Sequence, residues 1–216
     1  MKSYPIIGVI DLGTNTFHLI IAKVFPTRFE ILYKEKVSVR IGEGGIDDNT
    51  ITSEAENRAI TTLKDFKKRL VEYKAIKVKA LATSAFRSAD NAGLIIEKVK
   101  SEIGIQIEVI HGLQEARYIY NGVKHSLEFP EGNSLIMDIG GGSVEFIICD
   151  LDDVLWEHSF EIGGLRLMNR FHLEDPISES SIKNISLFLD EELKPLFEAC
   201  EKHKPATLVG ASGSFD

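Results

Sequence analysis

Two segments of the sequence place an aspartate at the end of an apolar run and follow it with glycine and small polar residues. In VIDLGTNTF, Asp11 is followed by Gly13, and in MDIGGGSVEF, Asp138 is followed by three glycines. Aspartate is depleted from strands and is rarely buried without a partner, so each carboxylate needs something to bind. Glycines let a ligand approach backbone N–H groups, which bind phosphate, and carboxylates bind divalent cations, often through water. The two segments together predict a clamp for phosphate and its cation.

Either segment alone has a simpler explanation, because asparagine and glycine also make tight hairpin turns. For DLGTNT by itself we favour the turn. Three consecutive glycines are more than a hairpin needs, and the second copy of the pattern favours a ligand, with the two turns expected to face each other across a cleft. The candidate phosphate-binding residues in these segments are Gly13, Thr14, Asn15, Thr16, Gly140, Gly141, Gly142 and Ser143.

The elements that would position these residues follow from apolar periodicity and from helix-start and turn signals. In the first half we expect strands over 5–12, 17–24, 29–41, 76–83 and 105–110, and helices over 53–74, 89–104 and 114–127. Ser53 and Glu56 have the spacing of a capping box. The polar segment 128–133 is the best boundary, which gives domains 1–127 and 128–216.

The second half repeats the beginning of the first. Strands are expected over 134–140, 143–150, 154–164 and 206–213, and a long helix over 178–203 should kink near Pro195. Both halves start with strand, aspartate, glycine turn and two further strands, with the aspartates 127 residues apart, which indicates an internal duplication. The sequence stops soon after the last strand without the helix that normally follows, so we expect a truncated second domain.

Composition narrows the function classes. A 216-residue chain with 44% hydrophobic and 27% charged residues is typical of a globular protein, and a net charge of −8 argues against a nucleic-acid partner. The sequence has neither an apolar run that could span a membrane nor a signal peptide, and Cys149 and Cys200 lack metal-ligand spacing, so we expect a cytoplasmic protein with reduced thiols. His18 and His111 are expected to be structural.

Five ordered segments make the sequence similar to the Ppx/GppA family of exopolyphosphatases and guanosine pentaphosphate phosphohydrolases, within the actin-like superfamily. They are DLGTNTFHLIIA, ALATSAFRSADNA, VIHGLQEARYIYNGV, MDIGGGSVEF and the terminal GASGS, and the resemblance spans residues 7–214. It implies an α/β fold of two actin-like (ribonuclease H-like) domains, the second incomplete at its C-terminus.

The resemblance also implies roles for individual residues. Glu115 in GLQEA matches the proposed general base, although Gln114 stands where many members have a second glutamate. Arg87 in SAFRS matches an arginine that binds phosphate. On residue type alone, Arg87 is more simply a surface charge and Glu115 a partner of the helix dipole. The positions associated with Mg²⁺ or another divalent cation are Asp138 and Glu145, with Asp11 as the counterpart of Asp138, and GASGS adds Gly210, Ser212 and Gly213 to the phosphate-binding set.

The leading hypothesis is a hydrolase that releases terminal phosphate from inorganic polyphosphate, guanosine pentaphosphate or both. An ATP-dependent kinase of the same superfamily and a non-catalytic nucleotide-binding scaffold are the alternatives. The expected partner is the substrate, without nucleic acid or membrane, and a homodimer stays open. The sequence does not choose between the two substrates.

Overall fold

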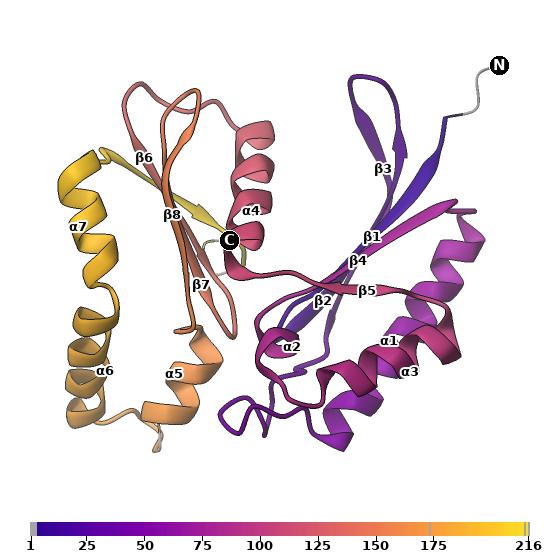
Figure 1. Ribbon diagram of the computed structural model, residues 1–216, viewed down its shortest axis with the longest axis horizontal. Coiled ribbons are helices and arrows are strands. Elements are labelled where there is room, and N and C mark those ends of the chain that lie inside the picture. Colours follow the sequence, from indigo (N-terminus) through magenta and orange to yellow (C-terminus); the bar gives the residue numbers. More distant parts are fainter. Residues whose placement is uncertain (1–3, 173, 214, 216) are drawn as a thin grey trace. The chain divides into compact units, whose positions relative to one another are not determined.

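The computed structural model of the protein describes residues 4–172, 174–213 and 215. Contacts divide the chain into two compact units that meet in sequence between Ile110 and His111. Figure 1 shows the elements of each unit. In chain order the first unit contains β1 (Ile6–Leu12), β2 (Thr16–Val24), β3 (Phe29–Ser38), α1 (Ser53–Glu72), β4 (Lys77–Ala82), α2 (Ser84–Ser88), α3 (Ala92–Ile103) and β5 (Ile107–Val109).

The first unit is a five-stranded sheet in the order β3-β2-β1-β4-β5, with β1 antiparallel to β2 and parallel to β4. Alternate residues of β1 and β2, such as Ile10, Phe17 and Leu19, are fully buried, as period-two strands require. They share a core with Leu63 and Phe66 of α1. The sheet and this helix layer hold the end of β1 and the turn that follows it.

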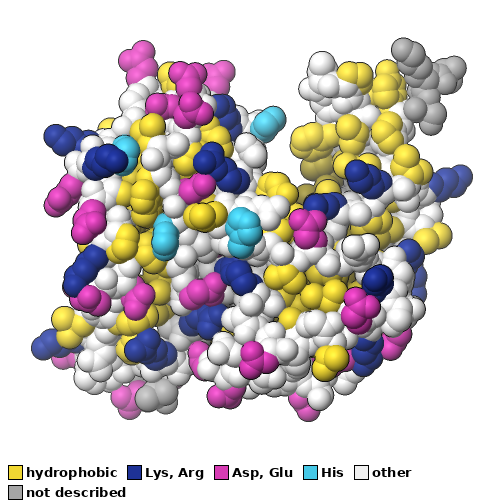
Figure 2. All heavy atoms as spheres, viewed as in Figure 1, with side chains coloured by type: hydrophobic (Ala, Val, Ile, Leu, Met, Phe, Trp, Pro, Cys, Tyr) yellow, Lys and Arg dark blue, Asp and Glu magenta, His cyan; other side chains and the backbone are white. Residues whose placement is uncertain are grey.

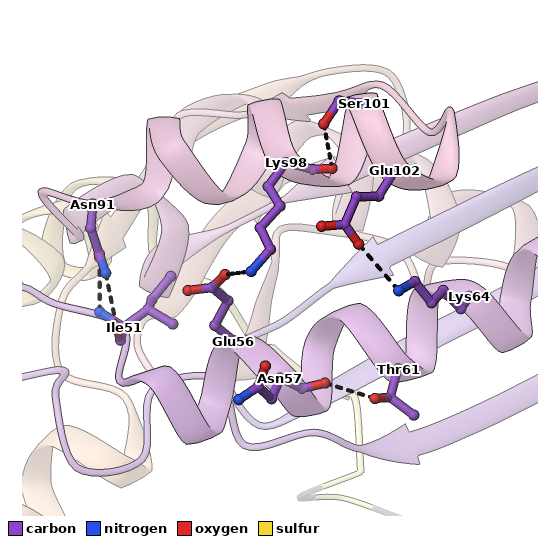
Figure 3. A network of polar contacts seen from close by, with 9 residues as sticks. All are labelled: Ile51, Glu56, Asn57, Thr61, Lys64, Asn91, Lys98, Ser101 and Glu102. Carbon is purple, nitrogen blue, oxygen red and sulfur yellow. Dashed lines mark hydrogen bonds and ion pairs between the residues drawn. The ribbon is translucent and has the colours of Figure 1, made fainter.

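Polar contacts fasten α1 to α3 (Figure 3). Lys98 of α3 pairs with Glu56 of α1 at 2.6 Å, and the Asn91 side chain accepts from the N–H and donates to the carbonyl of Ile51 at 3.0 and 2.8 Å. The predicted capping box of Ser53 and Glu56 is wrong. The Thr52 hydroxyl, one residue earlier than expected, caps α1, while Glu56 turns outward to Lys98.

The second unit repeats the strand order of the first as β8-β7-β6-β9, again with antiparallel strands on one side of the central strand and a parallel strand on the other. The duplication predicted from the sequence is thus visible in the topology. The elements are α4 (Gly112–Ser126), β6 (Ser134–Ile139), β7 (Val144–Cys149), β8 (Val154–Phe160), α5 (Gly164–Phe171), α6 (Glu179–Glu192), α7 (Lys194–His203) and β9 (Thr207–Ala211).

Helices cover both faces of this second sheet. Ala116 and Tyr120 of α4 pack with Ile136 and Ile147 on one face, whereas Leu196 of α7 packs on the other face. Because α4 buries its apolar side against the second sheet, it lies in the second unit. The predicted boundary at 127/128 therefore does not coincide with the limits of the packed units.

Two short helices, α2 and α5, lie where the sequence suggested only turn or strand ends. The expected long helix over 178–203 is two helices, α6 and α7, which meet at Leu193. Pro195 lies in the first turn of α7, where its missing N–H costs no helical hydrogen bond. The kink was thus predicted at the right place, but it is a full break.

Among the described residues, no helix is long and apolar enough to cross a membrane. Figure 2 shows positive and negative side chains intermingled on the visible face, with hydrophobic side chains gathered over the strands of the first unit.

Candidate active site

The turn after β1 is closed by one backbone hydrogen bond, from the N–H of Gly13 to the carbonyl of Thr16 at 3.1 Å. A Cβ at Gly13 would lie 2.9 Å from that carbonyl oxygen, so a larger residue is excluded by the turn itself. Thr14 is buried, and its Oγ1 has no hydrogen-bond partner among the described residues. Asn15 is exposed at the tip. A buried hydroxyl without a partner is costly, which favours a ligand or water at this point.

The turn after β6 has the same construction. Gly140 donates to the carbonyl of Ser143 at 3.0 Å, and a Cβ at Gly140 would again lie 2.9 Å from the acceptor. Gly142 and Ser143 are buried. The two predicted phosphate-binding turns are thus structural copies, including the reason for their first glycine.

The sequence analysis missed the residues that hold this second turn. The N–H groups of Gly164, Leu165 and Gly163 donate to the carbonyls of Gly140, Gly141 and Gly142 at 3.0, 2.8 and 3.1 Å, respectively. The glycine pair in IGGLR was the available signal, but we read it as the end of a strand. A Cβ at Gly163 would lie 2.4 Å from the carbonyl carbon of Gly142, so only glycine allows the two backbones to touch.

An acidic row crosses the second sheet beside this turn. Asp138 pairs with Glu145, and Glu145 pairs with Ser159, in the register of β6, β7 and β8. Residues directly opposite each other lie on the same face of a sheet. Glu145 is only 1% exposed, and the Ser159 hydroxyl donates to its Oε1 at 2.6 Å. Ser159 is a further residue that the sequence analysis did not identify.

Burial raises the pKa of Asp138, and a hydrogen bond from Ser212 opposes part of that shift. Within the described parts of the chain, no group of three or more His, Cys, Asp or Glu side chains is arranged to hold a metal ion. Asp138 and Glu145 are nevertheless adjacent carboxylates on one face, a donor set that suits a hard cation that keeps most of its waters.

The first unit differs at the matching positions. Asp11 pairs with His18 as Asp138 pairs with Glu145, so a histidine stands where the second unit has its buried glutamate. Asp11 is exposed. Burial lowers the pKa of His18, and Lys36 and Lys34 lower it further, which disfavours a positive charge beside Asp11.

Helix α4 carries Glu115 in its first turn and begins on top of the acidic row. The N-cap is His111, whose Nδ1 accepts from the N–H of Gln114 at 3.3 Å, so its predicted structural role is confirmed. A Cβ at Gly112 would lie 2.4 Å from the Ser159 Cβ. The start of α4 therefore packs directly on the residue that hydrogen-bonds Glu145, and Glu115 follows in the first turn of the same helix.

Arg87 lies in α2, directly after β4, and its Nη1 donates to the carbonyl of Ile110 at 3.2 Å. This half-buried position is not that of a freely solvated surface charge.

The last predicted segment follows β9, which runs parallel to β6. Ser212 has a positive φ of 68°, and its hydroxyl donates to the carbonyl of Ile139 at 3.4 Å, next to Asp138. A Cβ at Gly210 would lie 2.3 Å from the Phe215 ring, so this glycine provides packing space. Gly213 lies in a turn, whereas Ser214 of GASGS lies outside the described residues.

Comparison with known proteins shows which family has a similar sequence and fold. The model of the Ppx/GppA phosphatase family matches residues 20–216. A guanosine-5'-triphosphate,3'-diphosphate pyrophosphatase of Photobacterium profundum is 32% identical over 213 residues, which are 97% of this chain and 42% of that protein. The chain thus spans less than half the length of that curated relative.

Two solved structures are similar over nearly the whole chain. An exopolyphosphatase from Cytophaga hutchinsonii has a TM-score of 0.95 at 46% identity, covering 98% of this chain and 68% of that one. The Ppx/GppA family member of Aquifex aeolicus has a TM-score of 0.74 at 34% identity, covering 97% of this chain and 67% of that one. The predicted fold of two actin-like α/β domains is confirmed, and the chain belongs to the Ppx/GppA phosphatase family.

Proposed function

We propose that this protein is a phosphoanhydride hydrolase that releases the terminal phosphate of inorganic polyphosphate or guanosine pentaphosphate by attack of water. The observation that carries the proposal is the duplicated turn, in which Gly13 and Gly140 close the same hydrogen bond at the end of a strand that carries Asp11 or Asp138. The relatives support the choice of reaction, since one is named an exopolyphosphatase and another a pyrophosphatase of guanosine-5'-triphosphate,3'-diphosphate.

Both turns would bind phosphate through backbone N–H groups. In the second unit the carbonyls of Gly140, Gly141 and Gly142 are engaged by the start of α5, which leaves the N–H side of these peptides for a ligand. In the first unit the buried Thr14 hydroxyl lacks a partner among the described residues and would donate to a phosphate oxygen. Ser212 and Gly213 would extend the phosphate-binding surface beside Asp138.

Asp138 and Glu145 would hold Mg²⁺ or another divalent cation, directly or through water, and Asp11 is the corresponding candidate in the first unit. Such a cation neutralises charge on the phosphate oxygens. The donor set fits because the two carboxylates are neighbours in register. Ser159 orients Glu145 by occupying one lone pair of Oε1. Burial raises the pKa of Asp138, and a bound cation would oppose that shift because it favours the ionised carboxylate.

Glu115 would accept the proton of the attacking water, and Arg87 would bind the phosphate that is transferred. Phosphoryl transfer depends mainly on positioning and charge neutralisation. Glu115 lies on a helix that is capped by His111 and seated on Ser159, so its backbone position is well defined. Arg87 is held at the end of β4 by its contact with the Ile110 carbonyl.

The cellular compartment and the partner of the protein are part of the same proposal. The thiols of Cys149 and Cys200 are free, which suits a reducing compartment, and we place the protein in the cytoplasm with a small or linear polyanion as its partner. A homodimer stays a prediction.

The test is phosphate release from long-chain polyphosphate, guanosine pentaphosphate and ATP, each with and without Mg²⁺. Glu115→Gln keeps the shape of the side chain and removes its basicity, so turnover should fall by about 10² to 10⁴ while binding persists. Glu128→Gln is the matched control, because Glu128 is exposed just beyond α4. Near-normal turnover of Glu115→Gln would place the base elsewhere. Transfer of phosphate from ATP to an acceptor, without net hydrolysis, would favour a kinase.

A further inference from the structure

In both units, the segment that follows the third strand hydrogen-bonds to the carbonyls of the glycine turn. After β3, the N–H of Arg40 donates to the carbonyl of Asn15 at 2.8 Å and the N–H of Gly42 to that of Thr14 at 3.2 Å. We call residues 39–42 and 162–165 the support segments.

The support segment after β8 repeats this pattern. The N–H of Gly163 donates to the carbonyl of Gly142 at 3.1 Å, and the N–H of Leu165 to that of Gly141 at 2.8 Å. In each unit the two donors are two residues apart, and the acceptors Thr14 and Gly141 are the same 127 residues apart as the two strand-end aspartates. The duplication therefore includes the support of the turn as well as the turn.

This arrangement decides which side of each peptide a ligand meets. In a trans peptide the C=O and the next N–H point in opposite directions. Because the Thr14 and Gly141 carbonyls point to their support segments, the N–H groups of Asn15 and Gly142 point away from them. The support segments thus select N–H groups, which suit an anion, over carbonyls, which would repel it.

An arginine holds the support segment of the first unit. Arg58 of α1 donates from Nε to the Val39 carbonyl at 2.8 Å and from Nη2 to the Arg40 carbonyl at 2.9 Å. The same Nη2 lies 2.9 Å from Oε2 of Glu43. Arg40 has a positive φ of 50°, which is unfavourable for a residue with a side chain, so the conformation needs this external support.

In the second unit, Arg166 donates from Nε to the Gly142 carbonyl at 3.0 Å and pairs with Glu161 at 3.0 Å. The far end of the first loop is also fixed, because the Asn91 side chain holds Ile51 by two hydrogen bonds (Figure 3). The loop after β3 is therefore fastened at both ends, with Arg58 at the end that meets the turn.

We propose that Arg58 and Arg166 are positioning residues for phosphate binding. Each acts through backbone carbonyls, Arg58 through the support segment and Arg166 on the turn itself, to keep the turn with its N–H groups toward the ligand. The inference rests on the proposed function only in taking a phosphate group as the ligand. A binding measurement therefore tests it separately from hydrolysis.

The experiment measures binding of tripolyphosphate by calorimetry, together with KM and kcat on polyphosphate, for Arg58→Gln and Arg58→Lys. Arg69→Gln is the matched control, because Arg69 lies on the same helix and pairs with Glu72 at the surface. Arg58→Gln should weaken tripolyphosphate binding and raise KM by about tenfold, the equivalent of about one net hydrogen bond, with little change in kcat. Arg58→Lys should recover part of the loss, and Arg69→Gln should match the unchanged protein.

A second pair repeats the test in the other unit, with Arg166→Gln compared with Arg170→Gln on α5. Normal tripolyphosphate binding by Arg58→Gln, even with a lowered melting temperature, would overturn the inference, as would equal losses in Arg69→Gln. If the unchanged protein binds tripolyphosphate but releases phosphate from neither long-chain polyphosphate nor guanosine pentaphosphate, the proposed function fails while the binding comparison still decides the inference. If it binds no tripolyphosphate, the inference fails, and phosphate release from guanosine pentaphosphate decides the proposed function separately.

Discussion

Replacing Gly112 by alanine should damage both the stability and the activity of the protein, because α4 begins in direct contact with β8. The new Cβ would lie 2.4 Å from the Cβ and 2.5 Å from the Oγ of Ser159. Optimal contact between carbon atoms is about 3.5–4.0 Å, so the helix or the strand must move by about 1 Å or more.

The size of the effect follows from two opposing contributions. Overpacking costs about 1–3 kcal/mol, while alanine in a helix gains up to about 1 kcal/mol over glycine. We therefore expect a net loss of about 1–2 kcal/mol, with a fall in melting temperature of about 2–4 °C per kcal/mol for a chain of this size. A displacement of Glu115 by about 1 Å can reduce turnover about a hundredfold.

Gly122→Ala is the control on the same helix. No atom lies within 4 Å of the Cβ position at Gly122, which is exposed, so this substitution should stabilise the protein by about 0.5–1 kcal/mol and leave activity unchanged. Urea unfolding and phosphate release would be measured on both variants. Adding Ser159→Gly to Gly112→Ala should restore part of the packing. If Gly112→Ala behaves like Gly122→Ala in both assays, α4 does not rest on Ser159 and the argument for the position of Glu115 is refuted.

Two further predictions concern titratable groups in the second unit. Burial raises the pKa of Asp138 in the folded state above its value in the unfolded state. The folded protein therefore holds this proton more tightly, and the carboxyl group lowers the free energy of unfolding as pH rises above the unfolded-state pKa. In metal-free buffer, Asp138→Asn should therefore increase the free energy of unfolding at pH 7 but not at pH 3. The variant should also raise the Mg²⁺ concentration that activity requires. If the difference in urea midpoint between the variant and the unchanged protein is the same at pH 7 as at pH 3, the prediction is contradicted. Burial raises the pKa of Cys149 to about 11. At pH 8 this thiol should therefore resist a disulfide reagent until the protein is unfolded, whereas the less buried Cys200 should react first. Immediate reaction of both thiols in native buffer would refute this prediction.

Local patterns were sufficient for most of the fold. The apolar alternation of β1 and β2 and the helical spacing of α1 gave elements close to those observed, since residues such as Phe17 and Phe66 are fully buried where the patterns require it. The duplicated aspartates pointed to both glycine turns. Strand pairing then brought Asp138 and Glu145 side by side, as the resemblance to the family suggested.

The features that the sequence did not reveal depend on contacts between distant segments. Ser159 is an ordinary strand residue until the register places it beside Glu145, and Arg58 is an ordinary helix arginine until the loop after β3 folds back to it. The boundary at 127/128 was placed at polar residues, but α4 packs by its apolar side on the second sheet. The helix α5 starts without a side-chain cap, because its first N–H groups are used by the glycine turn.

The contact between Gly163 and the glycine turn limits which substitutions this protein tolerates there. A side chain at Gly163 would collide with backbone atoms of Gly141 and Gly142, and one at Gly140 would collide with the carbonyl of Ser143. Backbone atoms cannot move aside as a flexible side chain can, so a substitution at either position must displace the turn itself. Any attempt to change the proposed substrate range should therefore keep Gly140 and Gly163, and we expect chimeras that exchange the loops around the turn to fold where substitutions at these two glycines do not.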